Sequence, residues 1–136
     1  ALPISLQGCY GMAAVTRRED GFYVVMKGRR AADDSMQALQ EDDLAGTEWE
    51  AVRIGQHSMV RLRIEADFAQ MKDEARFFYY KGDGDGGTWQ QIGAVQKLYF
   101  KMDHFAGCRF GLFVYATAQT GGRAGFSGFE YDMQTK

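Results

Sequence analysis

The sequence predicts an all-β fold, a sandwich or barrel of short strands joined by tight turns. Apolar and polar residues alternate with a period of two along most of the chain, as in strands that bury one face. Seventeen Gly, one Pro, seven Tyr, ten Phe and two Trp fit short strands and frequent turns. The length of 136 residues indicates one domain, residues 1–136, that can bury its own core.

Nine segments are expected to be strands, because each is a short apolar or alternating run bounded by turn residues. They are residues 10–16, 22–27, 50–54, 60–68, 76–80, 90–93, 97–102, 108–117 and 126–133.

Two of these segments differ in the faces they should bury. Residues 60–68 are apolar at even and charged at odd positions, which predicts an outer strand with one face in water. Residues 108–117 are apolar on both faces, with Phe110 on one and Phe113 on the other. We expect this second segment to be a central strand that is covered on both sides.

Two hairpins are expected from their turn residues. Asp20-Gly21 joins the first two predicted strands, and both residue types tolerate a positive φ. The Gly-rich run 81–88 joins the strands over 76–80 and 90–93, and we expect the tip of this longer loop to be mobile.

Residues 32–46 depart from the β pattern. Asp33 and Ser35 could cap a short helix there. Because Leu39 and Leu44 do not keep helical spacing, the pattern favours an acidic surface loop with a turn of helix.

Charge and hydropathy exclude two classes of partner. Sixteen Lys and Arg against 18 Asp and Glu give a net charge of −2, so no basic field is available for nucleic acid. No run approaches the ~18 consecutive apolar residues of a membrane-spanning helix. The chain has no recognisable targeting segment, which fits either a cytoplasmic or an exported protein.

The titratable residues form no recognisable catalytic or metal-binding motif. Glu65-Ala66-Asp67-Phe68-Ala69-Gln70 is close to the Glu-x-Asp-x-x-Glu strand of sandwich glycosidases, but its last residue is an amide that cannot exchange a proton. Asp83-Gly84-Asp85 could begin a calcium loop, but Ala94 stands where that loop needs Glu. His57 and His104 are too few for a histidine metal site. We expect no catalytic residue, no metal and no cofactor in this chain.

Two further residue pairs, one of cysteines and one of glutamates, are considered for a structural or chemical role. Cys9 and Cys108 are either two small buried thiols or one bridge between strands. Glu48 and Glu50 form a second carboxylate pair without a third member, which is weak evidence for chemistry.

Several sequence blocks occur in the order and spacing of a known family. In the second half of the chain they are Phe77-Phe78-Tyr79-Tyr80, Thr88-Trp89-Gln90-Gln91-Ile92-Gly93, the run from His104-Phe105 to Ala116-Thr117, and Gly121-Gly122 with Ala124-Gly125-Phe126-Ser127-Gly128-Phe129-Glu130-Tyr131. An earlier hairpin, 11–15 followed by 21–25, is similar as well. The chain resembles the C-terminal concanavalin A-like domain of β-xylosidases and arabinofuranosidases in glycoside hydrolase family 43.

The resemblance implies a jelly-roll sandwich of two antiparallel sheets, attached to a separate five-bladed propeller that holds the catalytic carboxylates. It also implies that an aromatic side chain of this domain leans over the substrate pocket and limits it to the end of a xylan chain. The position that matches this aromatic residue is Phe105, beside His104.

The chain departs from the family pattern at three places. The family's domain runs longer at its N-terminus, so we expect the opening strands to be missing here. The acidic stretch 32–43 matches no family pattern. The closing strand, which usually carries Asp-Phe-Asp, reads Phe126-Ser127-Gly128-Phe129-Glu130.

Two functions are consistent with these observations. The preferred one is an accessory domain, inactive alone, of a xylan- or arabinan-degrading hydrolase, where it buttresses the catalytic propeller and shapes its pocket. The alternative is an independent, lectin-like module for xylan- or arabinan-derived oligosaccharides, with Trp89, Phe113 and Tyr115 on the concave sheet as stacking platforms. A small glycosidase is disfavoured by Gln70 and by the length.

Overall fold

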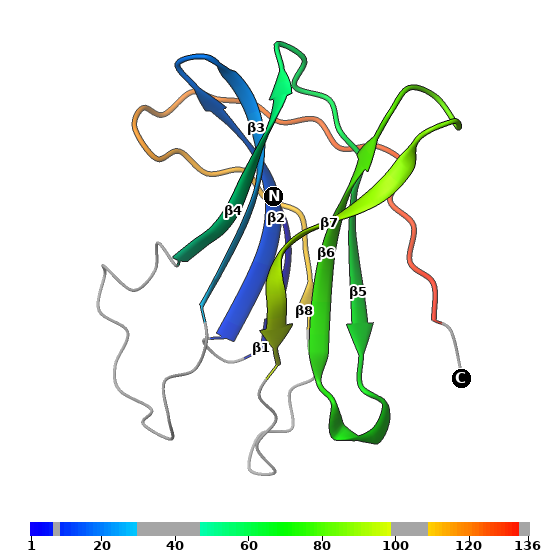
Figure 1. The fold of residues 1–136 in the computed structure, drawn as a ribbon. Helices are drawn as coiled ribbons and strands as arrows, with labels where there is room; N and C mark the ends of the chain where they lie inside the picture. The colour runs from blue at the N-terminus through cyan, green and yellow to red at the C-terminus, as the bar shows by residue number, and fades with distance from the viewer. Residues whose placement is uncertain (7–8, 30–46, 99–108, 134–136) are drawn as a thin grey trace.

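The computed structural model describes residues 1–6, 9–29, 47–98 and 109–133, and these residues form two antiparallel sheets (Figure 1). The five-stranded sheet has the order β4-β3-β2-β1-β8 and contains β1 (Leu2–Leu6), β2 (Cys9–Arg18), β3 (Gly21–Arg29), β4 (Thr47–Gly55) and β8 (Arg109–Phe110). The three-stranded sheet has the order β5-β6-β7 and contains β5 (Leu62–Asp67), β6 (Glu74–Lys81) and β7 (Thr88–Lys97). The all-β prediction is confirmed.

The only helical element in the described ranges is η2 (Ala69–Met71), a single turn between β5 and β6. No helix among these residues therefore has the length and apolar character needed to cross a membrane.

Both predicted hairpins are present. Arg18 pairs with Gly21 across the first turn, where Gly21 has a φ of 137° that favours glycine. The carbonyl of Asp20 accepts hydrogen bonds from Arg53 Nε and Nη2 at 3.1 and 2.6 Å, which ties this turn to β4. Lys81 pairs with Thr88 at the base of the second, longer loop.

The core lies between the two sheets and follows the period-two pattern. Residues 62–67 alternate between partly buried and exposed positions until Ala66, as the sequence predicts for a strand with one face in water. β5 lies at the edge of its sheet. The side chains of the buried cluster are Ile4, Ala13, Val24, Met26, Ala75, Phe77, Tyr79, Ile92 and Leu98. Alternate residues of β2, β3 and β6 thus supply most of the sandwich interior.

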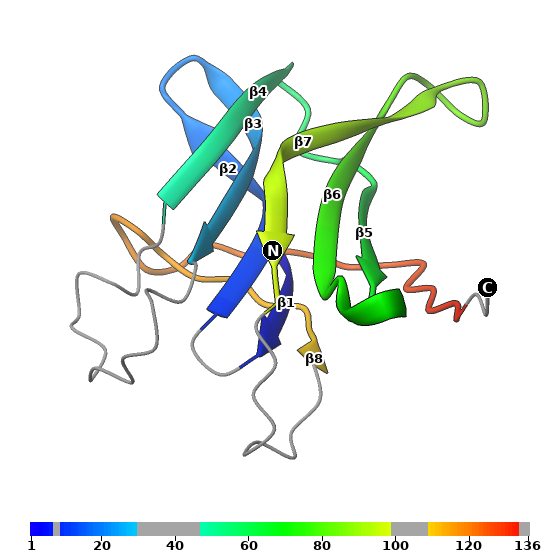
Figure 2. The same cartoon turned by 60° about the horizontal axis from the view of Figure 1, so that its bottom comes forward.

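β7 bends sharply between its two halves, so that its second half lies against the five-stranded sheet (Figures 1 and 2). The pairing of β6 with β7 is irregular between Ala75 and Phe77, opposite the stretch that contains Gly93. Gly93 has a φ of 73°, and a Cβ there would lie 2.6 Å from the sulfur of Met26. Glycine therefore permits both the bend and the close approach of the sheets.

Gln96 is a buried polar side chain in this interior, with 1 % of its surface exposed. Its Nε2 donates hydrogen bonds to the carbonyls of Arg29 and Lys97, at 3.1 and 3.2 Å. A Cβ on Gly28 would lie 2.5 Å from Gln96 Oε1, so the missing side chain of Gly28 makes room for the amide.

The structure corrects the prediction of a long central strand over 108–117. Only Arg109 and Phe110 form a strand, at the edge beside β1, and Leu112 to Thr117 are exposed. Pro3 explains why the ladder weakens, because it has no N–H to donate to the chain that lies opposite. Gly111 still donates to the Pro3 carbonyl at 3.3 Å.

Two further strand assignments change. Residues 126–133 are exposed and form no strand, and Gly128, with a φ of 63°, interrupts an extended alternation. The sequence does not predict β1, which lies between β2 and β8 and pairs with both.

The remaining expectations fall outside the described residues. These are the helix or loop over 32–46, the strand residues 99–102, and His104, Phe105 and Cys108. The side chain of Cys9 is also outside them, so the pairing of the cysteines stays a prediction.

Candidate functional site

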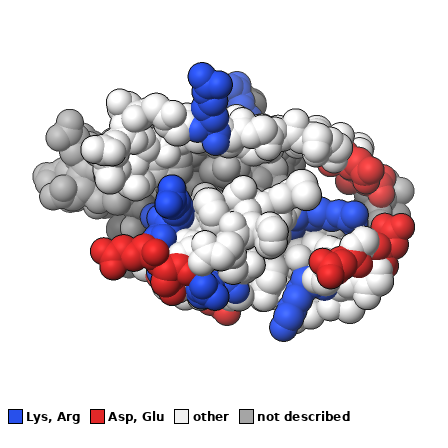
Figure 3. Space-filling view, turned by 90° about the horizontal axis from the view of Figure 1, so that it is seen from above, with Lys and Arg blue, Asp and Glu red and all other residues white. Residues whose placement is uncertain are grey.

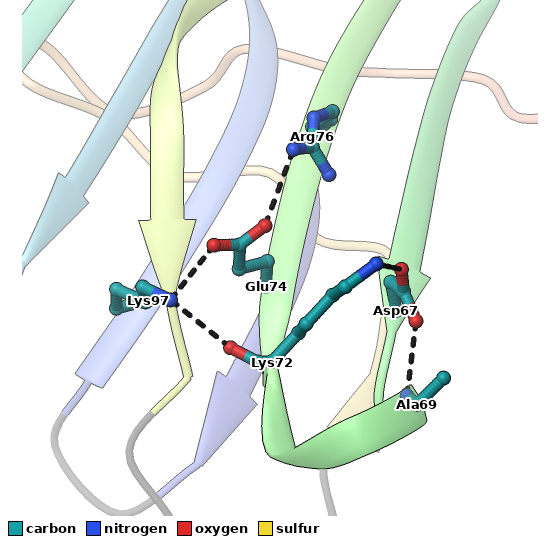
Figure 4. Close-up of polar contacts among 6 residues, drawn as sticks. All are labelled: Asp67, Ala69, Lys72, Glu74, Arg76 and Lys97. Atoms are coloured by element: carbon teal, nitrogen blue, oxygen red, sulfur yellow. Dashed lines mark hydrogen bonds and ion pairs between the residues drawn. The ribbon is translucent and has the colours of Figure 1, made fainter.

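The carboxylates that the sequence singled out on β5 are engaged in ion pairs. Glu65 contacts Arg63 at 2.5 Å. Asp67 contacts Lys72 at 3.3 Å and also accepts a hydrogen bond from the backbone of Ala69 (Figure 4). Gln70 lies in η2 with a φ of 54°. These side chains therefore take part in local structural contacts.

Glu74 is the centre of a second group in the same view (Figure 4). It contacts Lys97 at 2.7 Å and Arg76 at 3.2 Å, from β7 and from its own strand β6. The hydrogen bond from Lys97 lowers the pKa of Glu74 below its ordinary value, and the charge of Arg76 acts in the same direction. A carboxylate kept ionised in this way suits a structural contact.

Glu48 and Glu50 also have structural partners. Glu48 contacts Arg18 at 2.5 Å, and Glu50 accepts a hydrogen bond from the backbone N–H of Gly93 at 2.6 Å. The two carboxylates thus take part in different structural contacts.

Among the described residues, no group of three or more His, Cys, Asp or Glu side chains could hold a metal ion. Seen from above, Lys and Arg side chains are interspersed with Asp and Glu, and no broad region of one sign covers this face (Figure 3). A cluster of aromatic and arginine side chains at one end of the three-stranded sheet is a stronger candidate for a binding site.

The aromatic cluster is defined by Tyr80, Trp89, Arg61 and Arg63, at the end of the three-stranded sheet next to the Gly-rich loop. Tyr80 and Trp89 pair across β6 and β7, and their rings meet edge to face with centroids 5.4 Å apart. Trp89 is 38 % exposed. Its indole therefore offers apolar surface to a ligand.

Arginine side chains flank both rings of the aromatic cluster. The guanidinium carbon of Arg61 lies 4.8 Å from the centroid of Tyr80, and that of Arg63 lies 5.6 Å from the centroid of Trp89. Both distances are in the range of cation–π contacts. The cluster thus combines stacking surface with hydrogen-bond donors.

The Gly-rich loop holds Tyr80 in place. The backbone N–H of Gly87 donates to the Tyr80 hydroxyl at 2.8 Å. A Cβ on Gly87 would lie 2.4 Å from the Lys81 carbonyl and 2.6 Å from the Tyr80 ring, so only glycine allows the loop to close on the tyrosine. The ring that positions Arg61 is therefore itself fixed.

Phe113 and Tyr115 lie elsewhere, on the irregular C-terminal segment 111–133 that crosses the back of the molecule in Figure 1. Their ring centroids are 5.4 Å apart, and the rings are 38 % and 45 % exposed. Partial burial raises the pKa of the Tyr115 hydroxyl, and the charge of Glu48 adds to this.

The three predicted stacking residues thus form two separate groups. The aromatic partner of Trp89 is Tyr80, and that of Phe113 is Tyr115. Trp89 is on the face of its strand opposite to the core residue Ile92, and Phe113 and Tyr115 are in no strand. Their placement on one concave sheet is therefore wrong, while their role in sugar binding stays a prediction.

A hollow of about 2870 Å³ extends between the C-terminal segment and the sheets. Its lining includes Arg61, Tyr80 and Trp89 at one place and Phe113 and Tyr115 at another. It is larger than the ~300–1,000 Å³ typical of small-molecule pockets, so it is not a pocket shaped for one small ligand.

Sequence reasoning missed Tyr80, Arg61 and Arg63 as partners of Trp89. The alternation over residues 60–68 shows that the arginines face water, but only the pairing with β6 places them over the aromatic rings. His104 and Phe105, the predicted contribution to the substrate pocket, lie outside the described residues.

Comparison with known proteins gives one family. A family model described as the β-xylosidase C-terminal concanavalin A-like domain matches residues 5–132. Searches of curated proteins and of solved structures found no match.

Proposed function

This chain belongs to the family of β-xylosidase C-terminal concanavalin A-like domains, and we propose that it packs on the catalytic propeller of a xylan- or arabinan-degrading glycoside hydrolase and shapes its substrate pocket. Family membership makes the chain an accessory domain of a glycoside hydrolase family 43 enzyme. The packing and the effect on the pocket are the proposed steps.

The family match over residues 5–132 is the observation that carries the proposal. The contacts of five carboxylates support the proposal, because each has a structural partner in the described ranges. They are Glu48, Glu50, Glu65, Asp67 and Glu74. An accessory domain needs no acid and base of its own, since these come from the catalytic domain.

The C-terminal segment supports a role in packing. Eight of its large apolar side chains are exposed, by between 38 % and 73 %: Leu112, Phe113, Val114, Tyr115, Phe126, Phe129, Tyr131 and Met133. Exposed apolar surface on this scale is typical of sites that contact another protein or a ligand.

The proposed contribution to the pocket rests on Phe105, with His104 beside it. A ring from the accessory domain would narrow the pocket mouth, so that only the end of a xylan chain enters. Exclusion of longer chains would then depend on a residue that takes no part in bond cleavage.

The test is to express the chain and the catalytic domain encoded with it as separate proteins. We expect light scattering to show a one-to-one complex, and kcat/KM for xylobiose to rise when the two are mixed. The purified chain alone should release no 4-nitrophenol from an aryl xyloside. The absence of both a complex and a kinetic effect would contradict the proposal.

The alternative function, an independent carbohydrate-binding module, is favoured by one observation, the aromatic cluster around Trp89. Calorimetry with xylo-oligosaccharides distinguishes the two functions. Binding by the isolated chain that Trp89→Ala removes would support the module, and binding that Phe113→Ala or Tyr115→Ala removes would place it on the other aromatic pair.

A further inference from the structure

We propose that the aromatic cluster is a binding site for acidic oligosaccharides, in which Trp89 stacks on a sugar ring and Arg61 pairs with the carboxylate of a uronic acid. The proposal relies on the proposed function only for the carbohydrate nature of the ligand. It does not depend on packing against a propeller.

Arg61 is held at both its backbone and its side chain. Its carbonyl accepts a hydrogen bond of 3.0 Å from the N–H of Tyr80, which extends the pairing of β5 with β6. Its guanidinium lies 4.8 Å from the centroid of the Tyr80 ring. A ligand that binds this group therefore meets a guanidinium that is already placed, which lowers the entropic cost of binding.

Arg61 is also the least engaged arginine of this face. Among the described residues its one ion-pair contact is with Asp85, at 3.9 Å, and the Asp85 side chain is fully exposed on the Gly-rich loop. By contrast, Arg63 contacts Glu65 at 2.5 Å and Arg76 contacts Glu74 at 3.2 Å. An ion pair as long and exposed as that of Arg61 with Asp85 is easily exchanged for a ligand.

The chemistry of a stacked guanidinium selects the ligand. When its flat face lies against a ring, the N–H groups at its edge stay available for two parallel hydrogen bonds to a carboxylate. The hydroxyls of a neutral xylose unit accept only uncharged hydrogen bonds, whereas the carboxylate of a glucuronic acid branch accepts a charge-assisted pair. Arg61 thus favours acidic over neutral sugars.

Trp89 supplies the other half of the site. Its indole is 38 % exposed, and the edge contact with Tyr80 fixes its orientation. A flat, partly exposed ring beside polar donors suits the apolar face of a sugar. Trp89 would then bind the sugar ring and Arg61 the carboxylate, and both side chains contact the ring of Tyr80.

The cluster carries no excess of positive charge, which bears on specificity. Asp83 and Asp85 on the loop and Glu65 on β5 offset Arg61, Arg63 and Lys81. Recognition must therefore come from the geometry of Arg61 and not from a general attraction for anions.

The proposal is tested by calorimetric titration of the purified chain with three probes: xylotetraose with one glucuronic acid branch, plain xylotetraose and free glucuronate. We expect the branched sugar to bind at least about tenfold more tightly than the plain one, which corresponds to one charge-assisted contact. Free glucuronate should bind more weakly than the branched sugar, because it lacks the stacked ring.

Variants locate the site. Arg61→Ala should reduce the affinity for the branched sugar to that for the plain one, and Arg61→Lys should recover only part of it because Lys has no planar fork. Trp89→Ala should weaken both sugars. Arg76→Ala is the matched control, since Arg76 lies on the same face in contact with Glu74 and should leave binding unchanged.

Equal affinity for branched and plain xylotetraose would overturn the role of Arg61 and leave a neutral sugar site. Equal affinity for free glucuronate and the branched sugar would reduce the site to an anion site. Absence of all binding would overturn the whole proposal, yet the packing proposal would stand, because its complex and kinetics are measured with the catalytic domain.

Discussion

The carboxylate of Glu50 on β4 accepts a hydrogen bond of 2.6 Å from the backbone N–H of Gly93 on β7, and this bond joins the two sheets. The contact lies where β7 bends, so it helps to fix the position of the three-stranded sheet relative to the five-stranded sheet. Glu50 thus has a role in the sandwich itself.

Glu50→Ala should lower the free energy of unfolding by about 1 kcal/mol, the typical value of one such hydrogen bond. Urea denaturation measures this change. Glu65→Ala is the matched control, because it removes an exposed ion pair within one strand and should cost less. Equal losses for the two variants would contradict a role for Glu50 between the sheets.

Gly93→Ala should destabilise the domain far more than an ordinary glycine substitution. The new Cβ would lie 2.6–2.7 Å from three atoms of Met26, and the φ of 73° is unfavourable for alanine. Together these effects predict a loss of about 3 kcal/mol. Gly86→Ala serves as the control, because the nearest atom to its Cβ would be 3.9 Å away and its φ is not positive. A melting temperature that Gly93→Ala leaves unchanged would refute this account of the bend.

The stabilising effect of the contact between Glu74 and Lys97 should depend on pH. Because the folded state lowers the pKa of Glu74 from its ordinary value of 4.5, the carboxylate stabilises the fold above that pH. This contribution should disappear as the pH falls below 4.5 and through the lower pKa of the folded state. The stability difference between the native chain and Lys97→Met should therefore be larger at neutral pH than in acid, where only the hydrogen bond from Lys97 Nζ to the Lys72 carbonyl remains. A difference that is the same at both pH values would show that packing, and not charge, is what Lys97 contributes.

Tyr80→Phe should loosen the Gly-rich loop. The change removes the hydroxyl that accepts the 2.8 Å hydrogen bond from Gly87 but keeps the ring against Trp89. Amide hydrogen exchange at Gly87 should become faster, while exchange at Gly93, which donates to Glu50, should not change. Unchanged exchange at Gly87 would mean that the hydroxyl does not hold the loop.

The β character, two hairpins and the half-exposed character of β5 could be predicted because they depend on local signals. Asp20-Gly21 selects a tight turn, and the alternation over residues 60–68 separates a buried face from a wet one. β1 could not be predicted in this way, because its short run, which includes Pro3, has no clear alternation. It lies between β2, the next strand along the chain, and β8, and the pairing with Arg109 and Phe110 is not visible in local sequence.

The long strand expected over 108–117 shows the limit of apolar patterning. A run that is apolar on both faces needs other elements packed over both faces of its sheet, and the sequence does not say which elements those are. In the structure, Phe113 and Ala1 still exchange two hydrogen bonds, at 3.2 and 2.9 Å, beyond the end of β8. The pairing tendency is therefore present, but Pro3 opposite Gly111 removes a donor from the ladder.

The candidate site was predictable only in part. Trp89 was identified as a stacking residue because large aromatic side chains on a sheet suit sugar rings. Its partners depend on the register of β5, β6 and β7, which places Arg61 and Arg63 beside the rings. A single sequence shows that these arginines face water but not which side chain they face.

The central claim, that this domain restricts the substrate pocket of a xylan-degrading enzyme, is tested most directly by Phe105→Ala in the intact enzyme. The measurement is the product pattern from a long xylo-oligosaccharide, with Phe68→Ala as the control because Phe68 is an aromatic residue that is 50 % exposed next to η2. The account predicts that Phe105→Ala releases longer fragments as well as xylose, while Phe68→Ala releases only xylose like the native enzyme. Release of xylose alone by both variants, with unchanged kcat/KM, would contradict it.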